Sequence, residues 1–495
     1  MVITKIDMDI KRMFKQTAGL AVLALLVAIG PLFAQPRTPD LVSIVEQSSA
    51  GDAFWSVTVK DSTGRLLVGH NHDKLVRPAS NLKLLTSAAI LDQLGSDFRY
   101  QTYIYGMGEQ RGEVWKGDLI VRGSGDPSIS GRFYHEHRFH VFEEIANQLD
   151  SLGIRRVEGN LIGNDSYFDQ QPYPKGWSWE DLSFYYGVEI SALSFNNNAV
   201  DLQVFADDEV GETPRIQWFP FDTDYVDFIN EQTIAPPNTE YDEFYRRMLG
   251  TNTIVLGSKL PKGYYEEESL SIMNAPLFFM DTFNKYLEDS GIDITGQIII
   301  DSQPRNWSSD RFRVLARHDS PPLSELLVEV NTESSNFYTE MMLKTAAAEK
   351  YGVQGSTDLG IGLVEEFAHT AGMDTTDVEL SDGSGMSSST LLKPDDLTNF
   401  LSVMQEHPEF PAYEKSLAVA GFNGTLEHRF RGTPLERNVS GKTGYVSGVR
   451  AISGYMRARS GKKLVFSIYT NNYTNKTSYI DWLHQQLLMQ IYESY

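Results

Sequence analysis

The chain has 495 residues, of which 41% are hydrophobic and 12% aromatic, so it can bury a sizeable core and form two or three domains. Its formal net charge of −23 argues against a nucleic-acid-binding protein, because no basic face exists to replace the counterions of phosphate groups. The sequence contains no cysteine, which excludes disulfides, a thiolate nucleophile and cysteine-ligated metals.

The first 34 residues have the layout of a secretory signal peptide. Basic residues precede an uncharged apolar run over 18–33, and the run stops at Ala34-Gln35-Pro36. The run is shorter than the roughly 20 residues that a spanning helix needs, so we expect cleavage near Ala34 rather than a membrane anchor. No later segment is long and apolar enough to cross a bilayer, and we therefore expect an exported protein with no membrane span after cleavage.

The next segment predicts a β-hairpin followed by a helix. Apolar and polar residues alternate over 54–59, a turn signal follows at 61–64, and an apolar run resumes over 65–69. Leucine and alanine residues then recur at helical spacing until Gly95, which predicts a helix that begins near Ser80.

Residues 99–310 contain short β-rich stretches, many turns and aromatic clusters, which indicate a separate inserted domain. We therefore predict a signal peptide over 1–34, a main domain in two parts over 35–98 and 311–495, and the inserted domain between these parts. The second part is predicted to contain helices over 323–330, 337–350 and 360–371, strands over 446–457 and 463–470, and a last helix over 479–492.

Ser80 and Lys83 are the first candidates for chemistry. Residues at i and i+3 share a helix face, so the Ser80 hydroxyl and the Lys83 amine can come within hydrogen-bond reach. Lys83 lies among leucines, where desolvation would lower its pKa, and a neutral amine beside a serine is a general base. The helix N-terminus adds backbone N–H groups for a developing oxyanion. Alone, the pattern is more often a helix cap with an ordinary lysine.

Ser334 and Asn336 form the second candidate pair, at the loop that enters the predicted helix beginning at Phe337. From that position they can line a cleft, where Ser334 supplies a proton relay and Asn336 an amide that fixes a substrate backbone. In isolation, the same residues are typical of a simple N-cap.

Lys442, Thr443 and Gly444 form the third candidate motif, at the start of the predicted strand region. In a strand Lys442 and Gly444 face the same side, so an ammonium can hold a carboxylate while the glycine leaves room for a substrate along the strand edge. Taken alone, the triplet is equally a strand entry with a turn glycine.

The order Ser-x-x-Lys, Ser-x-Asn, Lys-Thr-Gly is the signature of penicillin-binding proteins and serine β-lactamases. Within that group the sequence resembles the class C, low-molecular-mass penicillin-binding proteins, a D-alanyl-D-alanine carboxypeptidase/endopeptidase group similar to the serine peptidase S13 family. The resemblance covers nearly all of the chain after the signal segment. It extends to the stretches 77–80, 123–127, 176–181, 185–187, 191–194, 382–386, 420–426 and 453–455.

The resemblance implies an α/β (α+β) fold, with a serine β-lactamase/DD-transpeptidase-like catalytic domain and a large β-rich inserted domain. It also implies a reaction in which Ser80 attacks the carbonyl between two D-alanines while Lys83 takes its proton, after which water hydrolyses the acyl-enzyme. By the same resemblance, Ser334 passes a proton to the leaving amine, and Asn336 holds the amide of the acyl chain.

The resemblance further implies the substrate contacts. Lys442 and Thr443 would bind the terminal carboxylate, and the backbone N–H groups of Ser80 and Tyr445 would form the oxyanion hole. Asp181, in the inserted domain, would reach the free amine of a diamino acid side chain in the stem peptide. Many relatives have serine or threonine where this chain has Tyr445, which keeps the backbone donor but removes a side-chain hydroxyl next to the substrate carboxylate.

The implied partners are peptidoglycan stem peptides as substrates and β-lactam antibiotics as covalent inhibitors, in the periplasm, with no metal or organic cofactor. One alternative is a serine β-lactamase or esterase of the same fold, although such enzymes are usually more compact than a chain with this insert. A second alternative is a catalytically silent wall-binding scaffold, which has no need of all six motif residues that carry polar side chains: Ser80, Lys83, Ser334, Asn336, Lys442 and Thr443.

Other chemistries find less support. Gly441 and Lys442 could belong to a phosphate-binding loop, but Glu436 stands where that motif requires its first glycine. No Gly-x-Ser-x-Gly elbow of an α/β-hydrolase occurs. His135, His137 and His140 form a cluster in which a metal site must be considered, but no matching run of ligands accompanies them, and we expect no metal site there.

Overall fold

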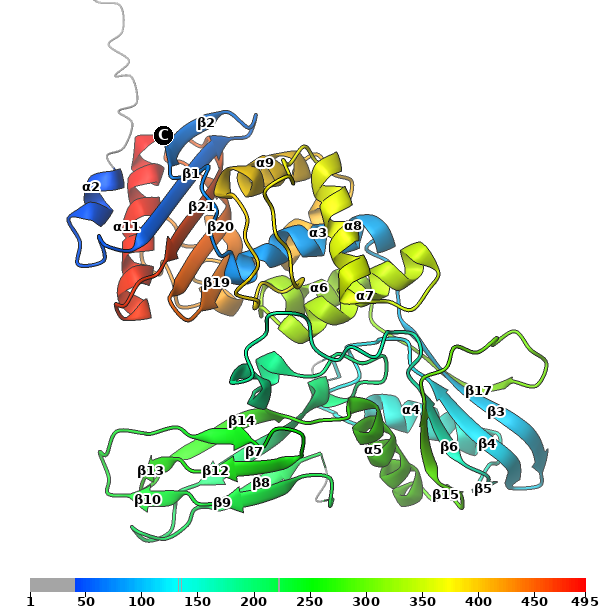
Figure 1. Ribbon diagram of the computed structural model, residues 1–495. Coiled ribbons are helices and arrows are strands. Elements are labelled where there is room, and N and C mark those ends of the chain that lie inside the picture. The colour runs from blue at the N-terminus through cyan, green and yellow to red at the C-terminus, as the bar shows by residue number, and fades with distance from the viewer. Residues whose placement is uncertain (1–40, 132, 135, 221–222) are drawn as a thin grey trace, which may run out of the picture.

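The computed structural model describes residues 41–131, 133–134, 136–220 and 223–495. In this part of the chain, a six-stranded sheet with helices on both faces forms an upper body, and a seven-stranded sheet with several smaller sheets forms a lower body beneath it (Figure 1). The predicted signal peptide over 1–34 lies outside the described residues. Among the helices of the described ranges, none has the length and apolar character needed to cross a membrane.

The six-stranded sheet is built from both ends of the chain. Its order is β18-β19-β20-β21-β1-β2, every neighbouring pair is antiparallel, and β1 pairs with β21 from Phe54 opposite Asn471 to Asp61 opposite Leu464. Both strands are buried along nearly their whole length. In β21 this burial agrees with the apolar run Leu464–Phe466, whereas β1 alternates apolar residues with buried polar ones. The strands are β1 (Phe54–Asp61), β2 (Leu66–His70), β18 (Ala418–Val419), β19 (Val439–Val446), β20 (Val449–Arg457) and β21 (Lys463–Asn471).

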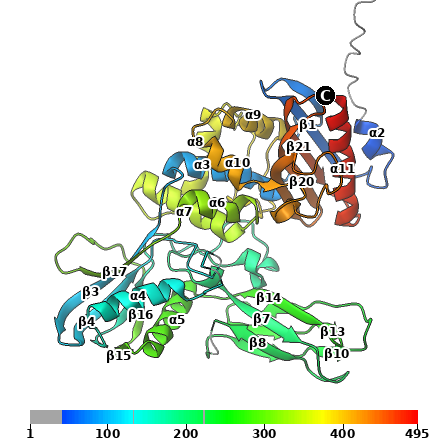
Figure 2. The ribbon, with the colours of Figure 1, turned by 180° about the vertical axis from the view of Figure 1, so that it is seen from behind.

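Helices cover the two faces of this sheet differently. The C-terminal helix α11 (Thr477–Ser494) packs on one face with α2 (Leu41–Glu46), and its buried residues recur every three or four positions from Ile480 to Ile491. Figure 2 shows these two helices across the sheet from α3 and α9. The second face carries α3 (Lys83–Leu94), α6 (Leu323–Asn331), α7 (Asn336–Tyr351), α8 (Thr357–Thr370), α9 (Pro394–Met404) and α10 (Phe410–Ser416).

The lower body contains a seven-stranded mixed sheet with the order β15-β5-β4-β3-β17, to which β6 and β16 are joined through β4. Two amphipathic helices, α4 (His140–Ser151) and α5 (Ala275–Asp289), share its hydrophobic core. The strands are β3 (Gln101–Arg111), β4 (Val114–Arg122), β5 (Arg156–Glu158), β6 (Leu161–Asn164), β15 (Asp293–Ile294), β16 (Ile298–Asp301) and β17 (Arg313–Asp319).

Smaller sheets extend the lower body on the side of β14 (Figure 1). The first has the order β14-β7-β8, the second β11-β12-β9, and the third pairs β10 with β13. Their strands are β7 (Ala199–Phe205), β8 (Arg215–Phe219), β9 (Asp227–Asn230), β10 (Thr233–Ala235), β11 (Tyr245–Arg247), β12 (Thr253–Leu256), β13 (Lys259–Pro261) and β14 (Tyr265–Ser271).

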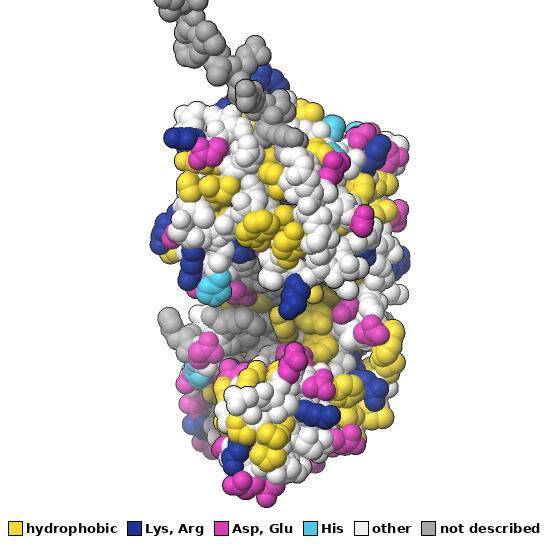
Figure 3. Space-filling view, turned by 90° about the vertical axis from the view of Figure 1, so that its left-hand side faces the viewer, with side chains coloured by type: hydrophobic (Ala, Val, Ile, Leu, Met, Phe, Trp, Pro, Cys, Tyr) yellow, Lys and Arg dark blue, Asp and Glu magenta, His cyan; other side chains and the backbone are white. Residues whose placement is uncertain are grey.

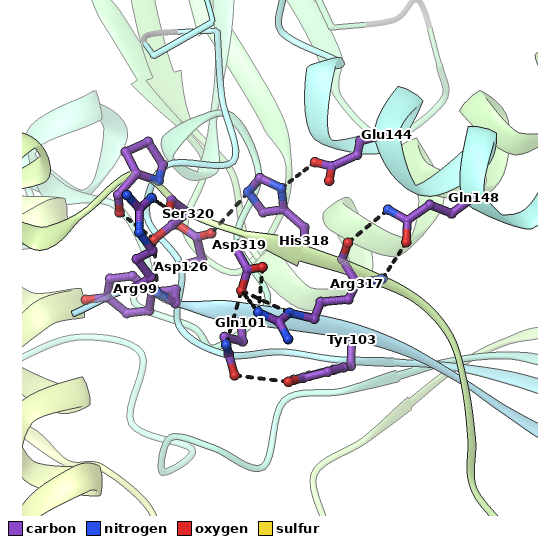
Figure 4. Close-up of polar contacts among 12 residues, drawn as sticks. Arg99, Gln101, Tyr103, Asp126, Glu144, Gln148, Arg317, His318, Asp319 and Ser320 are labelled. Carbon is purple, nitrogen blue, oxygen red and sulfur yellow. Dashed lines mark hydrogen bonds and ion pairs between the residues drawn. The ribbon is translucent and has the colours of Figure 1, made fainter. Parts of the chain in front are cut away.

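The two bodies are joined through the end of β17 (Figure 4). The buried ring of His318 lies with Nδ1 2.7 Å from Oε2 of Glu144 and with Nε2 3.7 Å from Oδ2 of Asp126. Two residues further on, the carbonyl of Ser320 accepts a 2.6 Å hydrogen bond from Arg99, which precedes β3. Since β3 leaves the upper body and β17 returns to it, the Arg99–Ser320 bond and the pairing of β3 with β17 link the two crossings, while His318 binds β17 to the lower body.

Most predicted elements are confirmed, including the first hairpin, the three helices after the insert and the last helix. The helix predicted to begin near Ser80 differs in its start. Ser80 lies in a 3-10 turn over Ala79–Leu82, and α3 begins at Lys83. Ala79 has a φ of 47°, so the chain enters this turn in a left-handed conformation that the periodicity of the sequence does not reveal.

The strand predicted over 446–457 was wrong at its start. The chain forms β19 up to Val446, turns at Gly448 with a φ of 71°, and returns as β20 from Val449. Lys442-Thr443-Gly444 lies inside β19, where hydrogen bonds to β20 hold a segment too polar to be recognised by its hydrophobicity. The domain boundaries remain a prediction. The insert is predicted to end at residue 310, and β17 lies beyond that residue but pairs with β3 of the lower body.

Candidate active site

The three sequence motifs meet where α3, α7 and β19 come together. Lys83 is the first residue of α3, directly after the turn that carries Ser80, and Asn336 is the first residue of α7. Ser334 lies in the loop between α6 and α7, and Lys442 projects from β19. The three motifs are far apart in the sequence, so only the tertiary fold brings them together.

Lys83 is fully buried, with its Nζ surrounded by three oxygens. The Oγ of Ser80 lies at 2.9 Å, Oδ1 of Asn336 at 2.6 Å and the carbonyl oxygen of Ser384 at 2.9 Å. Burial lowers the pKa of Lys83 to about 7, and the nearby carboxylate of Asp382 opposes this shift. A substantial fraction of neutral amine therefore exists at neutral pH, in hydrogen-bond contact with the serine hydroxyl.

Lys442 forms the second lysine centre. Its buried Nζ lies 2.7 Å from Oγ of Ser334 and 2.9 Å from the carbonyl oxygen of Thr443. Burial, followed by the positive charge of Lys83, holds the pKa of Lys442 well below its ordinary value. The two lysines are thus close enough for their charges to interact. Each has one serine hydroxyl as a hydrogen-bond partner.

Ser334 has a φ of 68°, a left-handed conformation that is uncommon for a residue other than glycine. The next residue, Ser335, caps α7 by accepting a hydrogen bond from the N–H of Tyr338 at 3.2 Å. The predicted N-cap therefore exists, but it belongs to Ser335. Ser334 instead forms a hydrogen bond with Lys442. Its left-handed backbone conformation is of a kind that is concentrated at functional sites.

Gly444 fixes how closely β19 approaches the serine turn. A Cβ atom at this position would lie 2.8 Å from the carbonyl oxygen of Pro78 and 3.2 Å from Cβ of Ala79. On its outer edge, β19 pairs with β18 only at Ser440 and Gly441. From Lys442 onward, β18 therefore does not pair with the outer edge of β19. This part of the edge lies directly beside Ser80.

The sequence profile of the D-Ala-D-Ala carboxypeptidase 3 (S13) family matches residues 38–486. The chain belongs to this family. Among its relatives, the D-alanyl-D-alanine carboxypeptidase of Actinomadura sp. (strain R39) is 32% identical and covers 88% of this chain and 81% of its own length. D-alanyl-D-alanine carboxypeptidase DacB of Haemophilus influenzae is 24% identical over 90% of each chain. These matches confirm the predicted family and the peptidase class.

The fold is shared with a solved structure. The crystal structure of penicillin binding protein 4 (dacB) from Haemophilus influenzae matches with a TM-score of 0.81 at 23% sequence identity, over 91% of this chain and 99% of that chain. A second structure of the same protein, complexed with a novel β-lactam, matches with a TM-score of 0.75 at 22% identity. The predicted mixed fold with an inserted β-rich region is therefore confirmed.

The S13 chain also contains site residues that the sequence did not single out. Glu340 lies one turn after Asn336 on α7, fully buried, and its Oε1 accepts hydrogen bonds from the N–H groups of Gly383 and Ser384 at 2.9 and 2.8 Å. Burial, followed by the charge of Asp382, raises the pKa of Glu340 to about 7. The i+4 spacing from Asn336 was the signal that could have revealed Glu340.

Asp382 organises the loop that bears Ser384. Its Oδ2 accepts hydrogen bonds from the N–H groups of Met386 and Ser387 at 2.8 and 2.9 Å, and from the hydroxyl of Ser384 at 3.0 Å. The loop carbonyl that contacts Lys83 is therefore held from two sides, by Asp382 and by α7. The stretch 382–386 contributed to the family resemblance, but its composition did not predict that it holds the carbonyl in contact with Lys83.

The inserted region reaches the site through two hydrogen bonds. Nδ2 of Asn336 donates to the carbonyl of Tyr186 at 2.9 Å, and Nε1 of Trp177 donates to Asp382 at 3.1 Å. Figure 3 shows the surface hollowed between the upper and lower bodies of the molecule. The S13 insert thus helps to position an asparagine and a loop that both contact Lys83.

Asp181 lies in a short 3-10 turn over Asp181–Ser183 of this insert, half-buried. Burial, followed by the charge of Glu180, raises its pKa, and Asp181 in turn helps to raise the pKa of Tyr186. It is therefore near the residue that holds Asn336. In the described ranges no hydrogen bond links the Asp181 carboxylate to the six motif residues. Asp181 therefore lies at the edge of the cluster that these residues form and not inside it.

Tyr445 follows the Lys-Thr-Gly triplet in β19, with 57% of its side chain exposed. It lies opposite Arg450 of β20, whose guanidinium is 5.9 Å from the tyrosine ring. Asp481 of α11 binds this guanidinium in a bidentate fashion, at 2.7 and 2.9 Å. Tyr445 therefore places an aromatic ring next to the strand edge. The guanidinium of Arg450, held by Asp481, lies beside this ring.

Proposed function

We propose that this S13 protein is a serine D-alanyl-D-alanine carboxypeptidase, DD-endopeptidase or both, acting on peptidoglycan stem peptides through an acyl-enzyme on Ser80. The observation that carries the proposal is the 2.9 Å contact between Oγ of Ser80 and a fully buried Lys83 whose pKa is about 7. A lysine with that pKa is neutral often enough to act as the base for a serine hydroxyl at physiological pH.

In the acylation step, the neutral Lys83 takes the proton of Ser80 as Oγ attacks the carbonyl carbon between two D-alanine residues. The negative charge that develops on the carbonyl oxygen would be stabilised by the backbone N–H groups of Ser80 and Tyr445. The C–N bond then breaks, and the leaving amine receives a proton from Ser334, which regains one from Lys442. The products are an ester on Ser80 and a free D-alanine, or, in the endopeptidase reaction, a free peptide that carries the leaving amine.

Before deacylation the proton on Lys83 returns through solvent to Lys442, so that both lysines regain their starting forms. Water then attacks the ester, and Lys83 takes a proton from this water and passes it to Oγ of Ser80 as the ester bond breaks. The Asn336 side chain would orient the acyl chain by a hydrogen bond to its amide. Its Oδ1 and Nδ2 already bind Lys83 and the Tyr186 carbonyl, so it is held in one rotamer when substrate arrives.

Substrate would lie as an added strand along β19, beyond the two residues that β18 pairs. Lys442 and Thr443 would bind its terminal carboxylate. A carboxylate next to Lys442 favours the charged ammonium, which burial alone disfavours, so binding and recharging of this lysine go together. Asp181 would receive the free amine of the diamino acid side chain, from the insert side of the cleft.

The proposal includes the setting of the reaction. The sequence layout of residues 1–34 supports export, and a cell-wall substrate places the protein in the periplasm. β-Lactam antibiotics, whose strained amide mimics the D-Ala-D-Ala bond, would acylate Ser80 and remain bound as covalent inhibitors. The proton transfers above use side chains of this chain, and no cofactor enters them.

The experiment is acylation by a fluorescent penicillin, followed by mass mapping of the labelled peptide, with Ser80→Ala as the matched control. A stable adduct on the Ser80 peptide that is absent in the variant supports the proposal, and release of D-alanine from a pentapeptide would then be measured. No adduct in a folded sample contradicts the mechanism. Rapid turnover of the penicillin would instead identify a β-lactamase.

A further inference from the structure

A second cluster of ionisable side chains lies on the inserted region, at the N-terminal end of α4. His137, His140 and Glu143 offer one ligand atom each, and the three atoms lie within 4.8 Å of one another. Nδ1 of His137 is 3.6 Å from Oε2 of Glu143, and the two imidazole rings have centroids 5.9 Å apart at an interplanar angle of 74°, in an edge-to-face arrangement. None of these residues takes part in the proposed reaction.

The spacing of these atoms fits one tetrahedral metal ion. With bonds of about 2.0–2.1 Å to histidine nitrogen and carboxylate oxygen, ligand atoms around zinc are separated by roughly 3.3 Å. The contact between His137 and Glu143 is close to that value, and His140 needs only a side-chain adjustment to reach it. The histidine cluster in the sequence did not include Glu143, which lies beside His140 only once α4 forms.

The surrounding structure holds the ring of His140 and the backbone of the other two ligand residues in place before any ion binds. The ring of His140 stacks on Tyr134 with centroids 4.1 Å apart and planes at 19°. The N–H of His137 donates to the carbonyl of Tyr134 at 2.9 Å, and the N–H of Glu143 donates to the carbonyl of Phe139 at 2.8 Å. A site arranged in this way loses less conformational entropy on binding than three free surface side chains would.

We propose that His137, His140 and Glu143 form a binding site for a divalent transition-metal ion of the zinc class, with a fourth position open to water. Two imidazoles and one carboxylate suit Zn²⁺, whereas Mg²⁺ and Ca²⁺ prefer sites made of oxygen alone. The proposal reverses the expectation that no metal site would form here. That expectation rested on the absence of further ligands in the sequence pattern.

The consequence of binding is structural. The segment that carries the ligands also carries Phe133, whose ring is 6.3 Å from that of Tyr338 on α7, and Tyr134, whose hydroxyl is 3.3 Å from Nε2 of His318. A metal ion on His140 therefore fixes a segment that contacts both the catalytic helix α7 and the buried histidine at the junction of the two bodies. The ion stabilises this part of the fold and takes no part in the acyl transfer.

The test is a calorimetric titration of the tag-free protein, freed of metal by a chelator, with zinc chloride alone. We expect one equivalent to bind, with affinity reduced at least tenfold in His140→Ala and in Glu143→Gln. His428→Ala is the matched control, because His428 is an exposed histidine with Nδ1 3.8 Å from Oε1 of Glu427 but belongs to no three-ligand group among the described residues. Calcium chloride should give no binding.

Thermal unfolding provides a second measurement, because an ion that binds only the folded state raises the melting temperature. Zinc should raise it in the parent protein and in His428→Ala, and leave it unchanged in Glu143→Gln. The proposal is overturned if zinc does not bind, if it binds equally well to the His140 and Glu143 variants, or if calcium binds as tightly. Penicillin acylation of each variant confirms that it is folded, since the substituted residues lie outside the reaction.

Discussion

Oε1 of Glu340 lies 2.8 Å from the backbone nitrogen of Ser384, whose carbonyl oxygen lies 2.9 Å from Nζ of Lys83. A buried carboxylate on α7 thus holds the loop that contacts the buried lysine on α3. The carboxylate and the lysine also share an electrostatic environment, because Glu340 raises the pKa of Lys83 while burial lowers it. This arrangement leads to predictions about how acylation depends on pH.

The rate of acylation by a penicillin should rise with pH. Only the neutral form of Lys83 can accept the serine proton, and a pKa of about 7 means that this form becomes dominant above neutrality. Below that pKa the rate should increase by roughly tenfold per pH unit and then level off. Stopped-flow measurements across the range check this, and a rate that falls with pH would exclude lysine as the base. Because Glu340 titrates nearby, the midpoint belongs to the coupled pair.

Glu340→Gln should move that midpoint to lower pH. The substitution removes a negative charge that raises the pKa of Lys83, while an amide oxygen can still accept from Gly383 and Ser384. Oε2 of Glu340 has no hydrogen-bond partner among the described residues, so the new amide nitrogen displaces no existing contact. Glu366→Gln, at an exposed carboxylate paired with Lys350, serves as the control. An unchanged midpoint in folded Glu340→Gln would show that this charge does not act on Lys83.

Lys442→Met should weaken recognition of substrates with a free terminal carboxylate. A hydrogen bond to a charged group contributes about 1.5–3 kcal/mol, so kcat/KM should fall by roughly 10- to 150-fold. A matched substrate with an amidated C-terminus lacks the charge, so its kcat/KM should fall less than that of the free-carboxylate substrate and should report only the part that Lys442 plays in proton transfer. Equal losses on the two substrates would assign Lys442 a role in proton transfer alone.

Gly444→Ala should impair acylation without unfolding the protein. The added methyl group would lie 2.8 Å from the carbonyl oxygen of Pro78, so β19 or the serine turn must shift. A displacement of this order at a reacting centre costs about 10²-fold in rate. Gly362→Ala is the control, because this α8 glycine has no atom within 4 Å of an added Cβ. We expect the control to gain roughly 1 kcal/mol of stability and keep full activity.

The sequence was informative wherever a residue type and its spacing determine the outcome. Ser80 and Lys83 are three positions apart, and the prediction that burial lowers the lysine pKa is confirmed. Glu340 and Asp382 were missed because their importance depends on α7 packing against a loop that follows it by some forty residues. The left-handed conformation of Ala79 likewise depends on its surroundings, which is why Ser80 was assigned to the wrong kind of helix.

The pairing of β1 with β21 has a consequence for how the protein is made. The strand that precedes Ser80 can complete its sheet only when the last strand of the chain has emerged, because β21 lies between β1 and β20. The inserted region lies between these partners in the sequence and has its own hydrophobic core. It can therefore fold first, while Ser80 and Lys442 are still separated. A chain truncated before β19 would contain the nucleophile Ser80 but would lack Lys442, and we expect it to be inactive.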